Sequence, residues 1–346
     1  MYILGIETSC DETAASIVRD GKEILSNVIA SQADQHEIFG GVVPELACRR
    51  HIDAIIPTLK QALKEASLTL DQVDLIAAAY GPGLIGALHI GVTSAKALSL
   101  SKKIPFLAIN HIEAHLYAAL MSHQDVLFPC LGAVLSGGHT SLVLIESLGT
   151  YSLIAETIDD AIGEAFDKVA KMMGLPYPGG PILEELAKQG DPYSYSLKAG
   201  HVKKKPLDFS FSGLKTAVLY KLKGPNTNSD KIESLSLSEK CNMAASFQRV
   251  AFQDVLSKIL LAAETYKTKT VIFGGGVTSS QTLRQLFSEK APHLRTLFPG
   301  KGLSLDNAAM IAGLAFHKWQ EKRESDSFGL EPASRIPISS FNPLTH

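Results

Sequence analysis

Residues 5–18 read GIETSCDETAASIV, and residues 133–145 read AVLSGGHTSLVLI. Both stretches run from an apolar strand pattern through a polar turn into a second apolar run, and in both a serine precedes a threonine by four positions. Each is followed later in the chain by a strand pattern, a glycine turn and a helix pattern, in residues 74–91 and 269–287. Two copies of one structural unit predict a duplicated fold with two lobes and a cleft between them.

The rest of the chain continues this alternation. Short apolar runs typical of strands alternate with helical patterns such as residues 49–66 and 242–266, which indicates the α/β class. The chain has 346 residues, 45% of them hydrophobic, which is enough for two lobes. We expect an N-terminal lobe of residues 1–108, to which residues 322–346 return, and a C-terminal lobe of residues 109–321.

The second copy of the unit is much longer than the first, because residues 150–268 separate its matching parts. This segment holds a helical stretch around residues 160–174. It also holds the loop LKGPNTNSDKIESLSLSEK, residues 222–240, which is rich in Gly, Pro, Asn and Ser and is predicted to be exposed. The C-terminal lobe is therefore expected to carry helical insertions.

The charge balance excludes a strong overall attraction to nucleic acid or anionic lipid, since the formal net charge is −2. Basic residues are instead grouped locally. Such groups are either ordinary solvated surfaces or a modest RNA-binding surface. The groups are Arg49, Arg50 and His51; Lys102 and Lys103; and Lys203, Lys204 and Lys205.

The four cysteines are scattered without CxxC spacing, which argues against a disulfide framework and favours a reducing compartment. The first residues, MYILGIETSCDETAAS, lack the basic and apolar regions of a signal peptide. No apolar run reaches the roughly eighteen residues that a spanning helix needs. We therefore expect a cytoplasmic protein with no membrane segment.

Residues 109–120 read INHIEAHLYAAL and carry two histidines four positions apart. Asn110 is a good helix N-cap, and Glu113 follows it by three positions, as in a capping box. In a helix that starts here, His111 and His115 lie on one face and can bind one metal ion. The alternative is a pair of partly exposed histidines at a helix start.

A metalloprotease of the HExxH type is not predicted by this stretch. In that motif the glutamate directly follows the first histidine, and Ile112 occupies that position here. Glu113 points about 200° around the helix from His111. The catalytic base of such a protease is therefore missing.

A divalent metal needs a third ligand, which LSLDNAAMIAGLAF, residues 303–316, offers in Asp306. Two histidines and one carboxylate suit iron(II) or zinc(II) with positions left open for a substrate oxygen. The alternative for Asp306 is a helix-start carboxylate that interacts favourably with the helix dipole.

Glycine-rich turns follow four strand patterns: YGPGLIG at 80–86, LSGGHTS at 135–141, YPGGP at 177–181 and FGGGV at 273–277. Such turns bring backbone N–H groups close to a phosphate, particularly where a helix begins. None matches a Walker A or GxGxxG motif, so P-loop and Rossmann folds are disfavoured. The first hairpin places Asp11 and Glu12 at its tip, where a carboxylate can face the cleft; the alternative is an ordinary polar turn.

Eight ordered motifs together resemble the universal tRNA threonylcarbamoyltransferase family of the bacterial TsaD type, whose members were once named glycoproteases. They are GIETSCDETAASIV, HEIFGGVVPELACRRH, GPGLIGALHIGVTSAK, NHIEAH, LSGGHTSL, AIGEAFDKVAKMMGLPYPGGP, DFSFSGLKTA and LDNAAMIA. The similarity runs from residue 1 to about residue 320. It implies the two-lobe actin-like ATPase fold, in agreement with the duplication.

The resemblance also implies a reaction. The threonylcarbamoyl group passes from threonylcarbamoyl-AMP to the exocyclic amine of the adenosine next to the anticodon, in tRNAs that read codons beginning with A. A TsaB-like paralogue and a TsaE-like ATPase are the implied partners. One divalent metal is the implied cofactor, with iron(II) the first choice and zinc(II) the second.

The site residues that the resemblance implies fall into three groups. The metal ligands are His111, His115 and Asp306. The substrate- and nucleotide-binding residues are Leu135, Ser136, Gly137, Gly138, His139, Asp167, Gly180, Glu184 and Ser280. The catalytic acidic residues are Asp11 and Glu12, one of which we expect to take the proton from the adenine amine.

Three positions depart from the family pattern. Ser280 stands where the family has asparagine, Glu184 where many relatives carry aspartate, and Leu305 where cysteine or threonine is usual. The first two departures bear on nucleotide contacts, whereas no metal ligand is lost.

Three other functions compete with the transferase. A small-molecule kinase of the same fold would leave the histidine pair and Asp306 without a role. A metalloprotease lacks its motif, and a non-catalytic scaffold would be expected to lack the metal residues.

Overall fold

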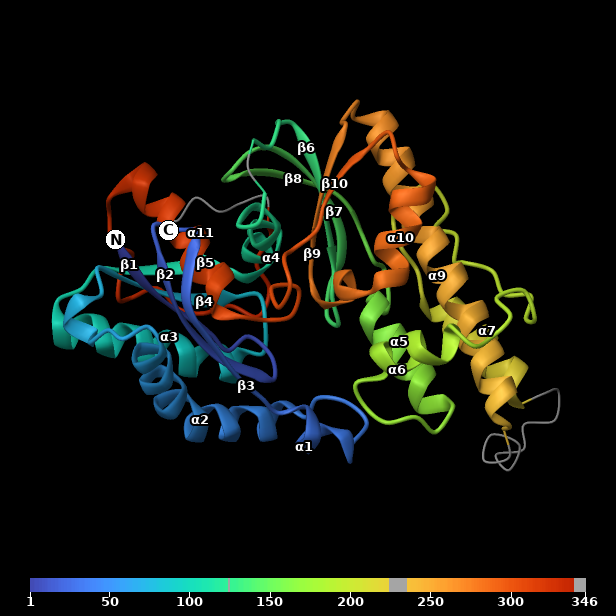
Figure 1. The fold of residues 1–346 in the computed structure, drawn as a ribbon, viewed down its shortest axis with the longest axis horizontal. Coiled ribbons are helices and arrows are strands. Elements are labelled where there is room, and N and C mark those ends of the chain that lie inside the picture. Colours follow the sequence, from blue (N-terminus) through green and yellow to red (C-terminus); the bar gives the residue numbers. More distant parts are fainter. Residues whose placement is uncertain (124, 224–234, 339–346) are drawn as a thin grey trace.

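The computed structural model describes residues 1–123, 125–223 and 235–338, and two five-stranded sheets dominate it (Figure 1). The first sheet has the order β3-β2-β1-β4-β5 and the second the order β10-β9-β6-β7-β8. The first comprises β1 (Tyr2–Glu7), β2 (Glu12–Arg19), β3 (Glu23–Ser31), β4 (Leu75–Gly81) and β5 (Phe106–Asn110). The second comprises β6 (Cys130–Leu135), β7 (Thr140–Ser147), β8 (Thr150–Glu156), β9 (Thr270–Gly274) and β10 (Arg295–Leu297).

The two sheets have the same topology. In each, three consecutive strands pair antiparallel, and the first of them pairs in parallel with the fourth strand, which pairs in parallel with the fifth. The repeated motifs form equivalent hairpins, with Gly5 opposite Ser16 in one and Ala133 opposite Leu142 in the other. The predicted duplication is therefore confirmed.

Helices cover the outer face of each sheet. On the first sheet, α2 (Pro44–Glu65) and α3 (Ile85–Lys102) pack together, and the short α1 (Ala33–Glu37) precedes them. On the second, α9 (Leu237–Thr265) contacts β6 and packs against three other helices. These are α6 (Gly179–Ala187), α7 (Ser212–Lys223) and α10 (Gln281–Lys290), and α5 (Ile162–Met172) packs against α6 and α7. Single-turn 3₁₀ helices lie at Leu70–Gln72 and Gly276–Ser279. The helix predicted around residues 160–174 is confirmed as α5.

The helical spacing of α2 shows why these elements pack as they do. Ala47, His51, Ile55, Leu59 and Ala62 recur every three or four positions and are all buried. They form one stripe that faces the sheet, as an amphipathic helix requires. Pro44 starts the helix at a position where a missing N–H costs nothing.

Two helices exchange lobes. Helix α4 (His111–Leu120) follows β5 of the first sheet but packs on the second, where Ile112 and Leu116 meet Val134 and Ile272. Helix α11 (Ala308–Lys322) follows β10 of the second sheet but packs on the first. The two helices also pack against each other between the sheets (Figure 1).

The exchange demands close contact at two glycines. A Cβ at Gly5 in β1 would lie 2.3 Å from the Ala308 carbonyl oxygen at the start of α11. A Cβ at Gly313 in α11 would lie 2.8 Å from Cε1 of Tyr117 in α4. Since real Cβ atoms do not approach this closely, both positions require glycine for the present packing.

The chain crosses between the lobes at β5–α4 and at β10–α11. Because α11 packs on the first sheet from Ala308 onward, we propose that residues 308–338 belong to the N-terminal lobe. Most of the predicted exposed loop 222–240 lies outside the described residues, as do residues 339–346 of the predicted returning segment. Among the helices of the described ranges, none is both long and apolar enough to cross a bilayer.

Candidate metal centre and active site

Helix α4 begins where the sequence predicts. The Asn110 side chain caps it, since Oδ1 accepts hydrogen bonds from the N–H groups of Ile112 at 2.9 Å and Glu113 at 3.1 Å. The helix presents His111 and His115 on one face, with ring centroids 4.5 Å apart. Both are buried, so the alternative of partly exposed helix-start histidines is wrong.

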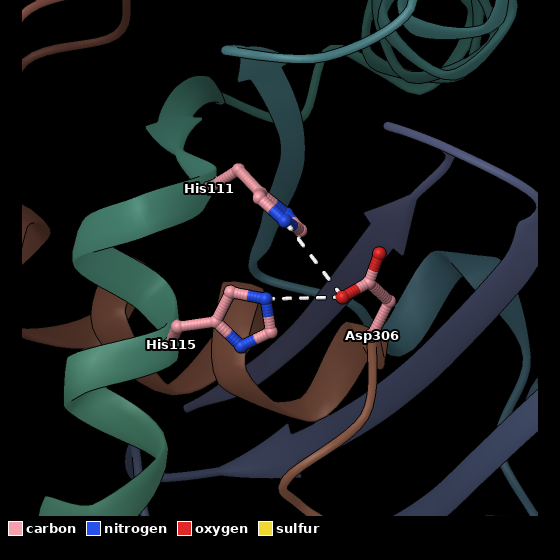
Figure 2. Close-up of side chains that lie close together, drawn as sticks. All are labelled: His111, His115 and Asp306. Atoms are coloured by element: carbon pink, nitrogen blue, oxygen red, sulfur yellow. Dashed lines mark ion pairs between the residues drawn. The ribbon is translucent and has the colours of Figure 1, made fainter. Parts of the chain in front are cut away.

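Asp306 reaches the same point from the segment between β10 and α11 (Figure 2). Its Oδ1 lies 3.0 Å from Nε2 of His115 and 3.7 Å from Nε2 of His111. One ligand atom from each of the three side chains falls within 4.8 Å of the others. Both crossings between the lobes thus contribute to a single group that could hold a metal ion.

The bonding of His115 fits a metal ligand. Both of its ring nitrogens are buried, and neither has a hydrogen-bond partner within the described residues. The Asp306 oxygen is near, but the contact lacks hydrogen-bond geometry. Buried polar atoms are nearly always satisfied in folded proteins. A divalent cation coordinated by Nε2, the nitrogen that faces Asp306, would remove the deficit at that atom.

A carboxylate that the sequence interpretation missed orients His111. Glu7 is fully buried at the end of β1, and its Oε2 lies 2.9 Å from Nδ1 of His111. Ser9 Oγ lies 3.2 Å from the same nitrogen. A carboxylate behind a metal-binding histidine fixes the ring and makes its other nitrogen a better ligand. The available signal was a glutamate closing an apolar strand directly before a polar turn.

The charges in this group stabilise one another. Burial lowers the pKa of His111, but the facing carboxylates of Glu7 and Asp306 outweigh it and raise the pKa to about 9. Burial also favours neutral Asp306, yet the imidazoles of His111 and His115 hold its pKa well below the ordinary value. At neutral pH the carboxylate is ionised, and metal binding must displace a proton from His111.

The acidic hairpin lies beside this group. Asp11 is buried, and burial, the charge of Asp11 and then that of Asp306 raise the pKa of Glu12 well above its ordinary value. From α2, His51 fixes the hairpin: Nδ1 lies 2.8 Å from Thr13 Oγ1, and Nε2 lies 2.9 Å from the Cys10 carbonyl oxygen.

The grouping of His51 with Arg49 and Arg50 as one basic cluster is therefore wrong for the histidine. The two arginines are exposed, as are Lys203 to Lys205, whereas His51 is fully buried. The reason is helical geometry, because His51 lies four residues from Ala47 and from Ile55 on the buried stripe of α2.

The turn Leu135–His139 joins β6 to β7 and has open space beside it. Ser136 fixes its shape, because its N–H donates to the His139 carbonyl at 2.8 Å and its Oγ accepts from the His139 N–H at 3.0 Å. A Cβ at Gly137 or Gly138 would meet nothing within 4 Å. Helix α5 begins against this turn, where Gly163 N–H donates to the Ser136 carbonyl. The turn and the positive end of α5 together suit a phosphate.

His139 connects this turn to the candidate metal centre. Burial, followed by the nearby His111 and His115, lowers the pKa of His139 to about 4. The ring is therefore neutral at physiological pH. It can donate one hydrogen bond to an anion but adds no positive charge.

Asp167 lies on α5 and accepts a hydrogen bond from the Gly179 N–H at 2.8 Å. Burial raises the pKa of Asp167 to about 6, although the amides of Gly179 and Gly180 act in the opposite direction. Asp11 contributes to the increase, which places the first hairpin and α5 close together. A Cβ at Gly180 would meet nothing within 4 Å, so this turn also has space beside it.

Two of the positions that depart from the family pattern contact each other. Ser280 Oγ donates to Glu184 Oε1 at 2.7 Å, and the Thr282 N–H donates to the same oxygen at 2.9 Å. Ser280 also caps α10, accepting from the Leu283 N–H at 3.1 Å. Glu184 and Ser280 are therefore direct hydrogen-bond partners. The third departure, Leu305, is exposed.

Ser280→Ala is expected to lower the free energy of unfolding by about 1 kcal/mol, the usual cost of losing a helix N-cap. The variant also leaves Glu184 with one hydrogen-bond donor fewer. Urea denaturation measures the change. Ser279→Ala is the matched control, because that exposed hydroxyl only donates to the Gly276 carbonyl. Equal unfolding free energies for the two variants would contradict this role for Ser280.

The capping box expected at α4 is only half present. Asn110 caps the helix, but the Glu113 carboxylate does not return to the Asn110 backbone. It instead accepts a hydrogen bond from the Tyr151 hydroxyl at 2.9 Å and pairs with Lys318 Nζ at 2.6 Å. Tyr151 and Lys318, which lie on other elements, therefore bind the carboxylate that the capping-box pattern assigns to the helix start.

A duplicated α/β fold with a phosphate-type turn and a His–His–Asp group between its lobes defines a class: two-lobe actin-like enzymes with a candidate metal centre. Solved structures support the fold. Full-length HypF in its phosphate- and nucleotide-bound form has a TM-score of 0.57 at 13% identity, covering 94% of this chain and 47% of that one. Component A of (R)-2-hydroxyglutaryl-CoA dehydratase from Acidaminococcus fermentans has a TM-score of 0.53 at 15% identity, covering 92% and 98%.

Sequence comparison identifies the family. Residues 23–313 match the family model TsaD, tRNA N6-adenosine threonylcarbamoyltransferase. The enzyme of that name from Protochlamydia amoebophila (strain UWE25) is 60% identical over 98% of this chain and 99% of its own. The enzyme of that name from Bacillus subtilis (strain 168) is 44% identical over 100% of this chain and 98% of its own.

The chain belongs to the TsaD family of tRNA N6-adenosine threonylcarbamoyltransferases. The predicted family, fold class and enzyme activity are confirmed. The kinase, protease and scaffold alternatives are set aside.

Proposed function

We propose that this transferase takes its acyl group from threonylcarbamoyl-AMP and acts on the adenosine next to the anticodon in tRNAs that read codons beginning with A. The convergence of His111, His115 and Asp306 beside the Leu135–His139 turn carries the proposal. A candidate metal group beside a turn that suits a phosphate would serve an acyl phosphate donor. The donor is already activated, so a covalent nucleophile on the protein is unnecessary.

The proposed cofactor is one divalent metal on His111, His115 and Asp306, with iron(II) the first choice and zinc(II) the second. When bound, it supplies a Lewis acid for an oxygen of the mixed carbamic–phosphoric anhydride. The unpartnered Nε2 of His115, which faces Asp306, and the Glu7 carboxylate behind His111 support this assignment.

The protein's own groups would bind the nucleotide part of the donor. The amides of Gly137 and Gly138, neutral His139 and the N-terminus of α5 would bind and orient the phosphate. Leu135 and Ser136 form the rest of the turn. We propose that the ribose and base of the nucleotide would bind on the second lobe's side of the site. The residues that would contact them there are Asp167, Gly180, Glu184 and Ser280.

The transfer itself balances without further reactants. The adenine amine forms a bond to the carbamoyl carbon, and the bond between that carbon and the phosphate oxygen breaks. AMP leaves with the electron pair. Glu12, or Asp11 through it, accepts the proton that the amine loses. Half-buried Glu12 suits this role, because its raised pKa makes the carboxylate a stronger base.

A TsaB-like paralogue and a TsaE-like ATPase are the proposed protein partners. Exposed apolar side chains on α2 and α3 support a docking surface on the outer face of the N-terminal lobe: Ile52, Ile56 and Ile85. Arg49 and Arg50 on α2 are candidates for tRNA phosphate contacts, as are Lys203 to Lys205. The proposed compartment is the cytoplasm, in keeping with four cysteines that form no disulfide in the described chain.

The test is reconstitution. The purified protein is incubated with threonylcarbamoyl-AMP, tRNA and cell extract from a strain lacking its own transferase, and the nucleosides are analysed by mass spectrometry. Threonylcarbamoyladenosine is expected, and only in tRNAs that read codons beginning with A. Modification of other tRNAs equally well, or no use of threonylcarbamoyl-AMP, would contradict the proposal.

A further inference from the structure

The face of α4 that points away from the candidate metal centre carries a buried ionic group. Glu113 is 2% exposed and bonds Tyr151 and Lys318 as described above. Tyr151 lies on β8 of the second sheet, and Lys318 lies on α11 against the first sheet. Three elements from both lobes therefore meet at one carboxylate.

The position of Glu113 in the helix relates this contact to the metal centre. It lies two residues from His111 and two from His115, so its side chain points about 200° around the helix from each. The contacts of Glu113 and those of the two histidines lie on opposite sides of the same helix. A rotation of α4 about its axis would disturb both sets together.

The Lys318 contact links the two segments that supply the ligands. Helix α4 carries His111 and His115, and α11 begins two residues after Asp306. The ion pair ties these helices together, next to the close approach at Gly313. Tyr151 ties α4 to the second sheet at the same point. These two bonds fix the rotation of α4 and its position along α11.

We propose that Tyr151, Glu113 and Lys318 are positioning residues for the metal centre. They hold His111 and His115 at the separation from Asp306 that one ion requires. Outer partners that orient metal ligands typically change metal affinity about 10- to 100-fold when they are removed. This inference rests on the proposed function of the His–His–Asp group as a metal site.

Variants of Glu113, Tyr151 and Lys318 are expected to remain folded. Glu113 and Lys318 line a cavity of about 550 Å³, which is large enough to admit water. Glu113→Gln keeps the shape of the side chain and a hydrogen-bond acceptor for Tyr151. The double variant Glu113→Gln/Lys318→Met removes both charges, so neither is left buried without its partner. Tyr151→Phe deletes a single hydroxyl.

The experiment is titration of the metal-free protein with Co²⁺, followed by visible absorption and by competition with a chromophoric chelator. Glu113→Gln and the double variant are expected to bind Co²⁺ at least about 10-fold more weakly than the unaltered protein and to shift its absorption bands. Tyr151→Phe should show a smaller change. Tyr117→Phe is the matched control, because it removes another buried hydroxyl of α4, which donates to the Gly21 carbonyl at 3.3 Å.

Two comparisons separate the possible failures. Equal Co²⁺ affinity in the unaltered protein and in His115→Ala would overturn the metal centre itself. A large loss in His115→Ala with no change in Glu113→Gln, Tyr151→Phe or the double variant would overturn only the positioning role. Thermal unfolding of the metal-free variants checks the fold. A lower midpoint with unchanged Co²⁺ affinity would mean that the group serves stability alone and would also overturn the inference.

Discussion

His115→Ala is expected to abolish metal binding and to slow tRNA modification by at least about 10³-fold. Losing a Lewis acid removes several kcal/mol of transition-state stabilisation, and each 1.4 kcal/mol is worth about tenfold in rate. The fold should survive, because the ring nitrogens of His115 make no hydrogen bond within the described chain. Metal content by mass spectrometry and initial rates with threonylcarbamoyl-AMP measure the two effects.

The control for this variant is His123→Ala. That histidine lies just beyond α4, and its Nε2 contacts the Phe298 carbonyl at 3.0 Å, away from the candidate centre. It should retain both metal and activity. Full activity in metal-free His115→Ala would reject the catalytic role of the metal.

Glu12→Gln is expected to lower kcat by about 10²- to 10⁴-fold, the range for loss of a positioned general base. The unaltered enzyme needs ionised Glu12, so its rate should rise with pH through the pKa of that carboxyl. Burial, Asp11 and Asp306 raise this pKa, so the rise should lie well above the ordinary value of 4.5. The variant should lose this limb of the pH–rate profile.

Asp11→Asn provides the companion measurement. Removing the charge of Asp11 should lower the pKa of Glu12 and move the acidic limb to lower pH, because that charge contributes to the raised pKa. A Glu12→Gln enzyme with an unaltered rate and an unaltered acidic limb would exclude Glu12 as the base.

The two hairpins were accessible from the sequence because their strands are neighbours in the chain. The repeated motifs at residues 5–18 and 133–145 each contain their own turn, and the two sheets follow from that unit. The exchange of α4 and α11 was not accessible. Every residue of α4 from His111 to Ala119 is buried, so the helix has no solvent-exposed face that would indicate which sheet it covers.

The candidate site likewise has parts that the local sequence predicts and parts that depend on long-range packing. The spacing of His111 and His115 follows from helical geometry, and Asn110 marks the start of the helix. The approach of Asp306 depends on the packing of α11, which no local pattern encodes. Glu113 shows the opposite failure: the capping-box pattern was present, but Tyr151 and Lys318 bind its carboxylate instead. His51 was misjudged although its spacing from Ala47 and Ile55 could have placed it inside.

The exchange of α4 and α11 between the two sheets suggests how such a fold arose. Suppose that a half-length ancestor had five strands and that the helix after the fifth strand extended away from its own sheet. One apolar face of that sheet would then have been exposed. Two such chains could cover each other by swapping their last helices, as in a domain-swapped homodimer. Gene fusion would then have made the partnership permanent, and the seam between the former subunits is where the candidate catalytic ion would sit.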